Sequence, residues 1–498
     1  MNDIIYAGLD VGTSGCKLVA YDLEGREIYS ASTRYTETGD NGLRELDPVI
    51  VIDSVKKTLC ETGHNCPKPI KALAVASIGE TVVFLDENDK PLMNALLTGD
   101  CRGIPQTQRL IQEKGAQKIF EITGLPPNEL YSLPKWMWVN EETDVLSRTE
   151  KILFFEDYVG YILTGKRKVS YSSAARSLAF DIEKKSWSQE LLSMAGIKAS
   201  QLSEPSAPFS IVGEILPNLA EELSLPKNLK IMVGGHDQTC AAFGSGLSGV
   251  TTGECGMGTC EFMFIMLPEP KMTPYMLEND FTCIPYVLPD SYLSSLEITT
   301  CGILKNWARD NLFTGFRDAC EKDAKNFFKE MDLRAMNLDT EVLLLPQFGS
   351  SGNPDLSMDA RGTITGLTIH TKREEIYRAI LEGMAFQNYL AHEKLKPLGT
   401  KMNTITATGG GAASDLALQI RADVFNMKVN TLENDESGTL GCMMMAAIAD
   451  GAYKSTEEAF SCAVRTGKEF SPNPQRHEVY MKKFQRYKKF YELMHDFM

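Results

Sequence analysis

The sequence predicts an α/β protein built from two related domains, each with a mixed sheet. Its 498 residues exceed what a single hydrophobic core usually serves. The first hundred residues follow the order three strands, helix, strands. In addition, a short pattern that begins at Asp10 returns at Glu254. Together these observations favour a duplicated α/β unit over one compact domain.

The composition narrows the class of protein. Hydrophobic residues make up 43% of the chain and charged residues 23%, which excludes a disordered, collagenous or coiled-coil protein. Lys and Arg number 51 against 66 Asp and Glu, so the net charge is −15. Such a chain is a poor platform for nucleic acid, because that ligand is held through many phosphates. One small phosphorylated ligand remains compatible with this charge.

The chain carries no targeting or metal-cluster pattern. MNDIIYAGLDVG has no basic run before an apolar stretch, and no apolar run reaches about eighteen residues. We therefore expect neither a signal peptide nor a membrane span. The 12 cysteines include no CxxC pair and no Cys/His cluster at zinc spacing. Reduced, mostly buried thiols in a cytoplasmic protein are the simplest interpretation.

The first domain begins with three short runs, IIYAGLDVG, KLVAYDL and REIYSASTRY, which predict consecutive antiparallel strands. A helix follows, capped by Asp47, with Pro48 in its first turn and Gly63 at its end. Its apolar stripe consists of Val49, Ile52, Val55 and Leu59. The runs IKALAVASIG and TVVFLD return to strands. We interpret residues 101–230, which are richer in helical spacing, as an elaboration of this domain.

An internal repeat organises the rest of the chain. DVGTSGCKLVAY, from Asp10, and ECGMGTCEFMFI, from Glu254, share an acid, a glycine two residues on, a small polar turn and a cysteine. This predicts two strand-turn-strand hairpins that face each other across a central interdomain cleft. The boundary falls near residue 245, in GSGLSGVTTG, which gives domains 1–245 and 246–498. Coincidence is the alternative, because the match is short.

The first hairpin turn can hold phosphates. It offers backbone amides, the hydroxyls of Thr13 and Ser14, and the positive charge of Lys17. Asp10 ends the strand beside it, where a carboxylate can hold Mg²⁺ directly or through water. An ordinary hairpin with an Asp in local hydrogen bonds is the alternative. The second hairpin would contribute amide and hydroxyl donors from the opposite wall, at Gly256, Gly258 and Thr259.

A candidate general base lies between the hairpins, in IMVGGHDQTCAAFGSG. Asp237 stands where a strand ends and a helix begins, and chemistry in α/β sheets usually occurs at the carboxyl ends of strands. It could accept the proton of a substrate hydroxyl that attacks a γ-phosphoryl group in line. A helix cap is the alternative for Asp237. His236 is more consistent with packing than with metal binding.

A second ligand-binding pattern lies near the C-terminal end. TITATGGGAASDLALQIRADVFNMKV predicts a strand, three glycines and a helix. Glycines before a helix allow backbone to approach a ligand closely, and the helix N-terminus favours an anion. The segment resembles a nucleotide-binding turn but lacks GxGxxG, so it is not a Rossmann fingerprint. Capping explains Ser414 and Asp415 equally well.

Four segments, in this order, resemble the FGGY carbohydrate kinase family: YAGLDVGTSGCKLVAYD, GGHDQTCAAFG, GECGMGTC and ATGGGAASDLALQIRADV. A fifth, DARGTITGLTIHTKREEIYRAILEGMAFQ, resembles the family's C-terminal signature. We interpret it as structural, because its helix spaces mostly apolar residues, at Ile376, Ile380, Met384 and Asn388. The resemblance implies two ribonuclease H-like domains of the actin, hexokinase and Hsp70 superfold, and an ATP-dependent kinase similar to xylulose, gluconate and glycerol kinases. Dimers are frequent in this family, so a homodimer is an expectation.

Carried over residue by residue, the resemblance implies that Asp10 assists Mg²⁺ and that Asp237 is the catalytic base. The ATP phosphates would be contacted by Thr13, Ser14, Lys17 and Thr259. The nucleotide would be bordered by Gly302, Gly410, Gly411 and Ser414.

The substrate residues depart from the family's known patterns. Glu80 resembles the acid that glycerol kinases place against substrate hydroxyls, but Gly79 stands where they have an arginine. Thr98 replaces their tryptophan and Leu130 their sugar-site tyrosine, while Ile78 and Gly79 replace the glutamine and histidine of xylulose kinases. The smaller side chains predict room for a ketopentose, ketohexose or polyol, with hydroxyls bound by Glu80, Asp100 and Asp237. A structural or surface carboxylate is the alternative for Asp100.

Three other functions stay open on the sequence alone: a glycerol kinase, a catalytically weak sugar-binding sensor of the same fold, and a chaperone-like ATPase of the same superfold. The presence of Asp10, Lys17, Asp237 and Thr259 argues against the sensor. A chaperone-like ATPase should carry a separate peptide-binding domain, which we do not expect after GMAFQ.

Overall fold

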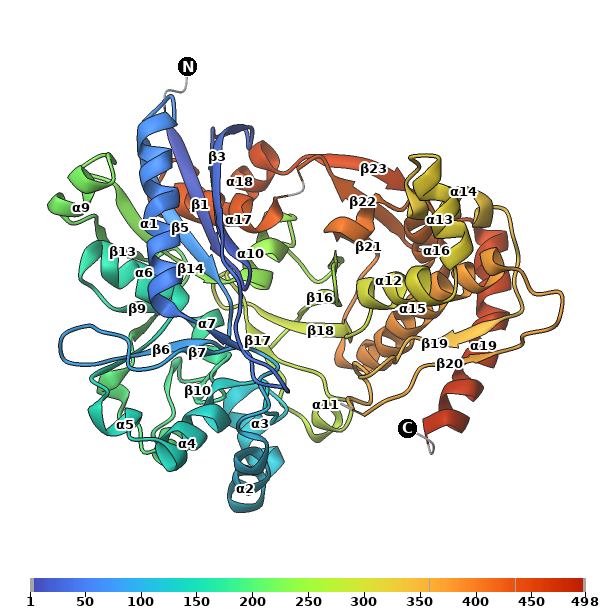
Figure 1. Cartoon of the computed structure of the whole chain (residues 1–498), viewed down its shortest axis with the longest axis horizontal. Coiled ribbons are helices and arrows are strands. Elements are labelled where there is room, and N and C mark those ends of the chain that lie inside the picture. Colours follow the sequence, from blue (N-terminus) through green and yellow to red (C-terminus); the bar gives the residue numbers. More distant parts are fainter. Residues whose placement is uncertain (1–3, 358, 435, 496–498) are drawn as a thin grey trace.

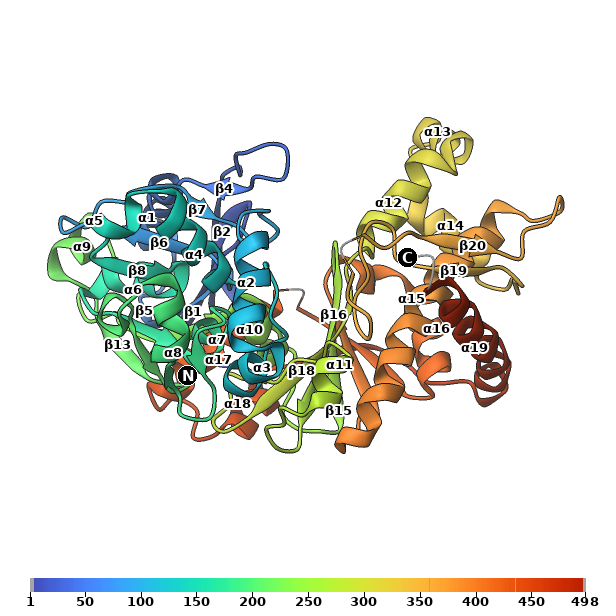
Figure 2. The same ribbon diagram turned by 90° about the horizontal axis from the view of Figure 1, so that it is seen from below.

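The computed structural model describes residues 4–357, 359–434 and 436–495, which form two lobes (Figure 1). Each lobe is built on one large sheet, with six strands in the N-lobe and seven in the C-lobe. Figure 2 shows the lobes side by side, with β16 and β18 on the side of the C-lobe that faces the N-lobe. The two-domain α/β fold predicted from the sequence is confirmed.

The N-lobe sheet consists of β1 (Ile5–Val11), β2 (Gly15–Tyr21), β3 (Glu27–Arg34), β5 (Ile70–Ser77), β13 (Ile211–Glu214) and β14 (Lys230–His236). Its strand order is β13-β14-β5-β1-β2-β3. The three predicted N-terminal strands are antiparallel neighbours. β1, β5 and β14 run parallel, so their carboxyl ends, including Asp10 and the residue before Asp237, meet at one edge of the sheet.

The C-lobe sheet consists of β15 (Thr252–Met257), β16 (Glu261–Leu267), β17 (Ile284–Pro285), β18 (Tyr292–Ile298), β21 (Thr404–Thr408), β22 (Lys428–Leu432) and β23 (Thr466–Phe470). Its order is β17-β18-β16-β15-β21-β22-β23. In this sheet β16 pairs antiparallel with β18 and with β15, β21 pairs parallel with β15 and with β22, and β22 pairs antiparallel with β23. The N-lobe sheet has the same sequence of pairings from β3 to β13. The predicted duplication is therefore present in the topology.

The register of the second hairpin differs from the sequence repeat. Val11 pairs with Cys16 before the first turn, and Met257 pairs with Glu261 before the second. The counterpart of Asp10 is therefore Gly256, and Glu254 lies two residues further back along its strand. The sequence match was therefore wrong by two positions on the first strand of the hairpin and by one on the second strand, since the first turn has four residues and the second has three.

Shorter strands pair in twos: β4 (Glu45–Leu46) with β7 (Ala95–Leu96), β6 (Val82–Leu85) with β8 (Lys151–Phe154), β9 (Lys168–Ser170) with β12 (Glu204–Ser206), β10 (Phe180–Asp181) with β11 (Ser186–Trp187), and β19 (Leu343–Leu345) with β20 (Thr363–Thr365). The α-helices that precede β15 in the chain are α1 (Pro48–Asn65), α2 (Ile104–Lys114), α3 (Ala116–Thr123), α4 (Ser132–Glu142), α5 (Val145–Arg148), α6 (Phe155–Thr164), α7 (Tyr171–Ala175), α8 (Gln189–Leu192), α9 (Pro217–Glu222) and α10 (Asp237–Gly244). Those that follow are α11 (Pro274–Glu278), α12 (Gly302–Asn311), α13 (Thr314–Lys322), α14 (Phe327–Ala335), α15 (Arg373–Leu395), α16 (Asp415–Phe425), α17 (Ser437–Ala449), α18 (Thr456–Ala463) and α19 (Pro474–His495).

Helix α1 begins as predicted but differs in two details. Asp47 accepts a hydrogen bond from the Val49 amide at 2.8 Å. Val49 itself is exposed, and Val51 takes its place in the buried stripe. The helix also continues through Gly63, where a Cβ would lie 2.2 Å from the Leu223 carbonyl oxygen. Gly63 is therefore needed for close packing and does not end the helix.

Helix α17 lies late in the sequence but packs against the N-lobe sheet beside β1 (Figure 1). A Cβ on Gly8 would lie 2.1 Å from the Thr439 carbonyl oxygen, so only glycine permits this approach. Helices α10 and α17 cross equally closely, since a Cβ on Gly244 would lie 1.8 Å from the Ser437 carbonyl oxygen. The crossing brings the start of α17 next to the end of α10. The predicted domain boundary near residue 245 lies between α10 and β15 and stays a prediction.

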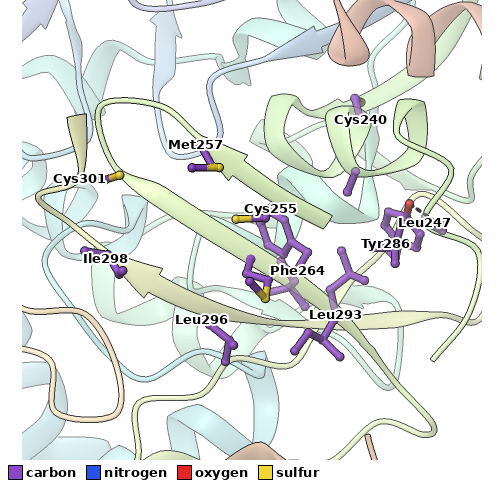
Figure 3. Close-up of a cluster of buried hydrophobic side chains, with 14 of the residues drawn as sticks. Cys240, Leu247, Cys255, Met257, Phe264, Tyr286, Leu293, Leu296, Ile298 and Cys301 are labelled. Carbon is purple, nitrogen blue, oxygen red and sulfur yellow. Dashed lines mark hydrogen bonds between the residues drawn. The ribbon is translucent and has the colours of Figure 1, made fainter. Parts of the chain in front are cut away.

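Buried apolar side chains continue from one lobe into the other. Figure 3 shows Cys240 and Leu247 near Tyr286 and side chains of β15, β16 and β18. The Tyr286 hydroxyl donates to the Leu247 carbonyl at 2.9 Å. The other face of the N-lobe sheet has a core of its own, beneath α1 and α6.

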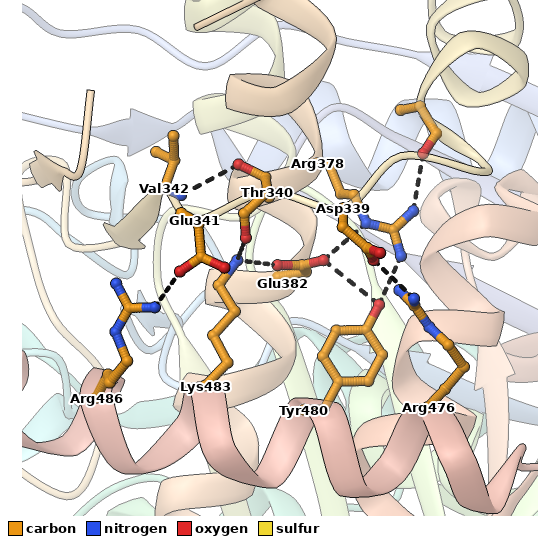
Figure 4. A network of polar contacts seen from close by, with 11 residues as sticks. Asp339, Thr340, Glu341, Val342, Arg378, Glu382, Arg476, Tyr480, Lys483 and Arg486 are labelled. Carbon is orange, nitrogen blue, oxygen red and sulfur yellow. Dashed lines mark hydrogen bonds and ion pairs between the residues drawn. The ribbon is translucent and has the colours of Figure 1, made fainter. Parts of the chain in front are cut away.

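The C-terminal helix α19 is fixed to the C-lobe by a polar network (Figure 4). Lys483 donates to Glu382 of α15 at 2.5 Å, and Arg378 donates to the Tyr480 hydroxyl at 2.7 Å. Arg378 and Glu382 are themselves a buried ion pair at 2.8 Å. This supports the structural interpretation of the segment around α15.

Within the described residues, none of the helices combines the length and the apolar character that a bilayer crossing requires. The 12 cysteines are free thiols, and most are buried. This agrees with the expected reduced state.

Candidate functional site

The first hairpin turn presents its hydroxyls to solvent. Thr13 and Ser14 are exposed, and the turn is closed by a 3.0 Å hydrogen bond from the Gly12 amide to the Gly15 carbonyl. The Tyr35 hydroxyl donates to the Gly12 carbonyl at 2.7 Å and fixes the turn from behind. The two hydroxyl side chains are thus accessible on a turn that hydrogen bonds hold in place.

Asp10 and Lys17 lie opposite each other on β1 and β2. Lys17 Nζ lies 2.5 Å from Glu436 Oε1, just before α17, and both side chains are 37% exposed. Asp10 Oδ1 is buried and has no hydrogen-bond partner among the described residues. Burial and the nearby carboxylates of Asp237 and Glu436 raise the pKa of Asp10 to about 7, and Lys17 opposes them. A carboxylate with an unused oxygen and acidic neighbours favours a cation.

Asp237 is the first residue of α10, directly after β14. His236, not Asp237, occupies the cap position, so the alternative role as helix cap is not realised. Its Oδ1 accepts from the Gln238 amide at 2.6 Å. Although densely surrounded by protein, the side chain is still 35% exposed and therefore reachable by a small ligand. Burial raises the pKa of Asp237 to about 6, against the effects of the Gln238 amide and Arg176.

His236 supports Asp237 without adding charge. Its Nε2 lies 3.1 Å from Asp237 Oδ1. Burial, assisted by Arg176, holds the pKa of His236 well below its usual value, so this contact joins a neutral ring to a carboxylate. The expectation that His236 packs is consistent with its burial.

Arg176, at the end of α7, is a site residue that the sequence did not indicate. It donates to Glu80 Oε1, and its guanidinium lies 5.0 Å from the centre of the Tyr131 ring. Its charge also acts on Asp237 and on Glu297 of β18 in the C-lobe. No motif surrounds Arg176 in the sequence, so only its position in space marks it.

The expected space beside Gly79 is already occupied. A Cβ at this position would lie 2.7 Å from the His236 ring and 3.0 Å from the Arg176 stem. Thr98 likewise donates to Glu80 Oε2 at 2.7 Å. The absence of larger side chains at these two positions therefore makes room for protein groups. That it also leaves room for a larger substrate stays a prediction.

Asp100 is engaged in a local ion pair. Arg102 donates to its carboxylate at 2.8 and 2.6 Å, and the Arg44 amide donates at 2.7 Å. Burial works against the ionised form, but these hydrogen bonds outweigh it and hold the pKa of Asp100 below its usual value. Both carboxylate oxygens are used, which favours the structural interpretation of Asp100 over substrate binding.

The second hairpin turn joins the start of α12. Thr259 is exposed, and its carbonyl accepts from the Gly302 amide at 2.9 Å. A Cβ on Gly302 would lie 2.7 Å from the Gly258 carbonyl oxygen, and one on Gly411 would lie 2.7 Å from the Met257 side chain. The structure thus brings the predicted nucleotide residues of three separate segments together.

The triple glycine lies between two cavities. One, of about 520 Å³, is lined by Gly410 and Ser414 on one side and by Lys305, Phe328 and Tyr377 on another. The second, of about 630 Å³, extends from Gly410 to β22 and residue 467. Ser414 caps α16 by accepting from the Ala417 amide at 3.1 Å, as the alternative interpretation expected. A larger cavity of about 790 Å³ lies on the other side of α16, away from the hairpins.

Residues 5–244 match the N-terminal domain of the FGGY family of carbohydrate kinases, and residues 253–449 match its C-terminal domain. The chain belongs to the FGGY family of carbohydrate kinases. A member of this family is a phosphotransferase with an alcohol group as acceptor, so the protein is a carbohydrate kinase. The match favours this activity over a sugar-binding sensor or a chaperone-like ATPase.

Similar proteins cover nearly the whole chain. The gluconate kinase of Lactobacillus acidophilus has a similar structure, with a TM-score of 0.89 and 26% identity over 99% of this chain and 98% of that one. The xylulose kinase of the same organism gives a TM-score of 0.88 and 27% identity over the same shares. In sequence, the xylulose kinase of Bacillus subtilis is 27% identical over 489 residues, which cover 97% of this chain and 96% of its own. These FGGY kinases share the two-domain fold of the actin and hexokinase type.

Proposed function

We propose that this protein phosphorylates a hydroxyl of a small carbohydrate, a ketopentose, ketohexose or polyol, with ATP as donor and Asp237 as general base. The observation that carries the proposal is the meeting of Asp237 with Asp10 at the carboxyl ends of β14 and β1, beside an accessible phosphate-binding turn. Full-length similarity to several xylulose kinases supports the substrate class.

Asp237 has the properties that a general base requires. With a pKa of about 6 it is mostly ionised at neutral pH and still basic enough to accept a proton. His236 Nε2 and the Gln238 amide hold its Oδ1, so Oδ2 is the atom that receives the proton of the substrate hydroxyl. The oxygen from which the proton leaves then attacks the γ-phosphoryl group in line.

Asp10 is the residue that would hold Mg²⁺, since its buried Oδ1 lacks a partner among the described residues. Mg²⁺ prefers oxygen ligands and commonly uses one or two carboxylates together with phosphates. No group of three His, Cys, Asp or Glu gathers as a ready-made metal site in the described part of the chain, which fits this mode of binding. Bound Mg²⁺ would neutralise charge on the phosphates.

The nucleotide would bind along the C-lobe and reach the first turn. Its phosphates would be bound by Thr13, Ser14, Lys17 and Thr259, which all lie on the two hairpins. The cavity of about 520 Å³, with Phe328 in its lining, suits a base. The backbone around it would be provided by Gly302, Gly410, Gly411 and Ser414. Self-association as a homodimer stays a prediction.

The experiment is a coupled ADP-release screen across ketoses and polyols, followed by Asp237→Asn on the best substrate. We expect kcat to fall about 100-fold or more, because a positioned base contributes about 10²–10⁴-fold. The affinity for an ATP analogue should change less than threefold. The exposed Asp290→Asn serves as matched control. Full turnover by Asp237→Asn would remove Asp237 from the mechanism.

A further inference from the structure

Charged side chains from both lobes meet around Arg176. Glu80 accepts from its Nη2, and Asp237 and Glu297 interact with its charge. Glu80 and Asp237 belong to the N-lobe, whereas Glu297 lies on β18 of the C-lobe. We call these four residues the Arg176 cluster.

Glu297 is held in place by its own strand and by a C-lobe loop. The Ser295 hydroxyl donates to Glu297 Oε1 at 2.6 Å, and the Glu297 amide donates to Asn353 Oδ1 at 2.9 Å. The side chain is half-buried, and its carboxylate interacts with the charge of Arg176. Its carboxylate is therefore a fixed part of the cluster.

The guanidinium of Arg176 has N–H groups without a partner, but its positive charge is already balanced by a carboxylate. Its side chain is only 17% exposed, and Nε has no partner among the described residues. Glu80 already neutralises its charge in direct contact. The carboxylates of Asp237 and Glu297 are additional, and the adjacent His236 ring adds no positive charge.

Resting on the proposed kinase function, we propose that the Arg176 cluster selects uncharged polyhydroxylated substrates and rejects sugar acids. Arg176 binds substrate oxygens, and Glu297 determines specificity. A sugar hydroxyl both donates and accepts, so it can donate to the carboxylates and accept from Arg176. An ionised sugar acid offers its carboxylate only as acceptor, and it places a further negative charge beside two uncompensated ones.

A site for sugar acids would need the opposite arrangement. Carboxylate ligands are bound best by a guanidinium whose parallel N–H groups are free for a bidentate contact. Here Glu80 occupies one Nη of Arg176, and the nearest charged groups are acids. The distinction matters because the similar proteins include both a gluconate kinase and xylulose kinases.

The first test compares substrates of matched length in the ADP-release assay. Five- and six-carbon ketoses and polyols, including D-xylulose and D-glucitol, are set against D-gluconate and the five-carbon aldonates. We expect kcat/KM for the best uncharged substrate to exceed that for every aldonate at least 100-fold. An aldonate that equals or exceeds it would overturn the selection while leaving the kinase function intact. ATP turnover with none of these substrates would overturn the proposed function as well.

The second test removes the charge of Glu297. Glu297→Gln keeps the hydrogen bond from Ser295 and should lower the inhibition constant of D-gluconate, measured against the best uncharged substrate, about tenfold, as expected for one charge at short range. The KM of the uncharged substrate should change less than threefold. Glu278→Gln, at an exposed position of the same lobe, is the matched control and should change neither value.

Arg176→Met should raise the KM of the uncharged substrate about tenfold with the KM of ATP unchanged, because a lost hydrogen bond from a charged group costs about that factor. An equal rise in both constants would point to a structural role and contradict substrate binding. If Glu297→Gln behaves like Glu278→Gln, the specificity role of Glu297 is overturned.

Discussion

The two hairpins of this kinase share one pairing scheme but use their charges in opposite ways. Asp10 and Lys17 of the first hairpin are partly exposed, and Asp10 keeps an unused oxygen. The carboxylate of Glu254 in the second hairpin is buried and accepts from Thr408 at 2.6 Å. Glu261 is buried as well, against Arg421 and other donors. The two copies thus share one scaffold, but only the first hairpin keeps its charged side chains partly exposed, whereas Glu254 and Glu261 of the second are buried.

The register explains this division. Because the counterpart of Asp10 is Gly256, the second hairpin has no carboxylate at the equivalent position. Its own acids instead hold the C-lobe together. Asn388, Arg421 and the thiols of Cys255 and Cys301 all direct donors at Glu261.

A matched pair of carboxyl-to-amide substitutions tests the division of roles between the two hairpins. Asp10→Asn should lower kcat about a thousandfold, because several kcal/mol of charge stabilisation depend on the metal that this carboxylate would hold. Glu254→Gln should change kcat less than threefold, since the Glu254 side chain is buried and engaged by Thr408. Steady-state kinetics with saturating ATP and Mg²⁺ measures both. Similar losses in the two variants would contradict the division of roles.

The second hairpin should dominate stability instead. Glu261→Gln leaves the buried Arg421 without its counter-charge, which costs about 3 kcal/mol or more. Removal of the exposed Lys17–Glu436 pair should cost less than about 1 kcal/mol. Urea unfolding of Glu261→Gln and Lys17→Ala measures the difference. A more stable Glu261→Gln would show that the ion pair is not needed.

The two turns should contribute unequally to ATP binding. Lys17→Ala removes a charged donor and should raise the KM of ATP about tenfold, whereas Thr259→Ala removes a neutral one and should raise it about threefold. The KM of the sugar should stay within twofold in both variants. A rise confined to the sugar KM would contradict the assignment of Lys17 to the nucleotide.

The smallest effect concerns pH and stability without metal. The pKa of Asp10 is about 7 in the folded protein against an ordinary 3.8, so the folded state binds the extra proton and loses stability as the pH rises through about 7. The pKa of Glu254 is raised to about 8, so its contribution to the stability of the folded protein is lost at a slightly higher pH. At pH 9, Asp10→Asn and Glu254→Gln should therefore melt about 2 °C or more above the wild type, with little gain at pH 4. If the two variants melted below the wild type at pH 9, this would contradict the prediction that ionisation of these two carboxyl groups destabilises the folded protein.

Local patterns in the sequence predicted much of the fold. Alternating apolar residues and turn glycines were sufficient for β1, β2 and β3, because neighbouring strands need only short connections. The sequence repeat suggested the duplication, but the length of the second hairpin turn could not be inferred from the amino-acid sequence. In α1, Val49 and Val51 are both apolar, and only the position of the sheet decides which one is buried.

The substrate side of the site was less predictable. Arg176 reaches Glu80 from almost a hundred residues away, and the space that receives it exists because Gly79 has no side chain. Glu297 joins this cluster from the other lobe. Asp100 was predicted to bind substrate because it is a carboxylate, but Arg102 donates a hydrogen bond to it. Such groupings arise from tertiary structure, which carries no local signal.

In the proposed mechanism, Asp237 takes the proton of the acceptor hydroxyl beside Asp10. A crystal structure of the protein with a non-hydrolysable ATP analogue, Mg²⁺ and the best sugar would show this contact. We predict one sugar hydroxyl oxygen at about 2.6–3.2 Å from Asp237 Oδ2, in line with the γ-phosphorus. A bound sugar whose phosphorylated hydroxyl faces a different carboxylate, with Asp237 out of contact, would contradict the account.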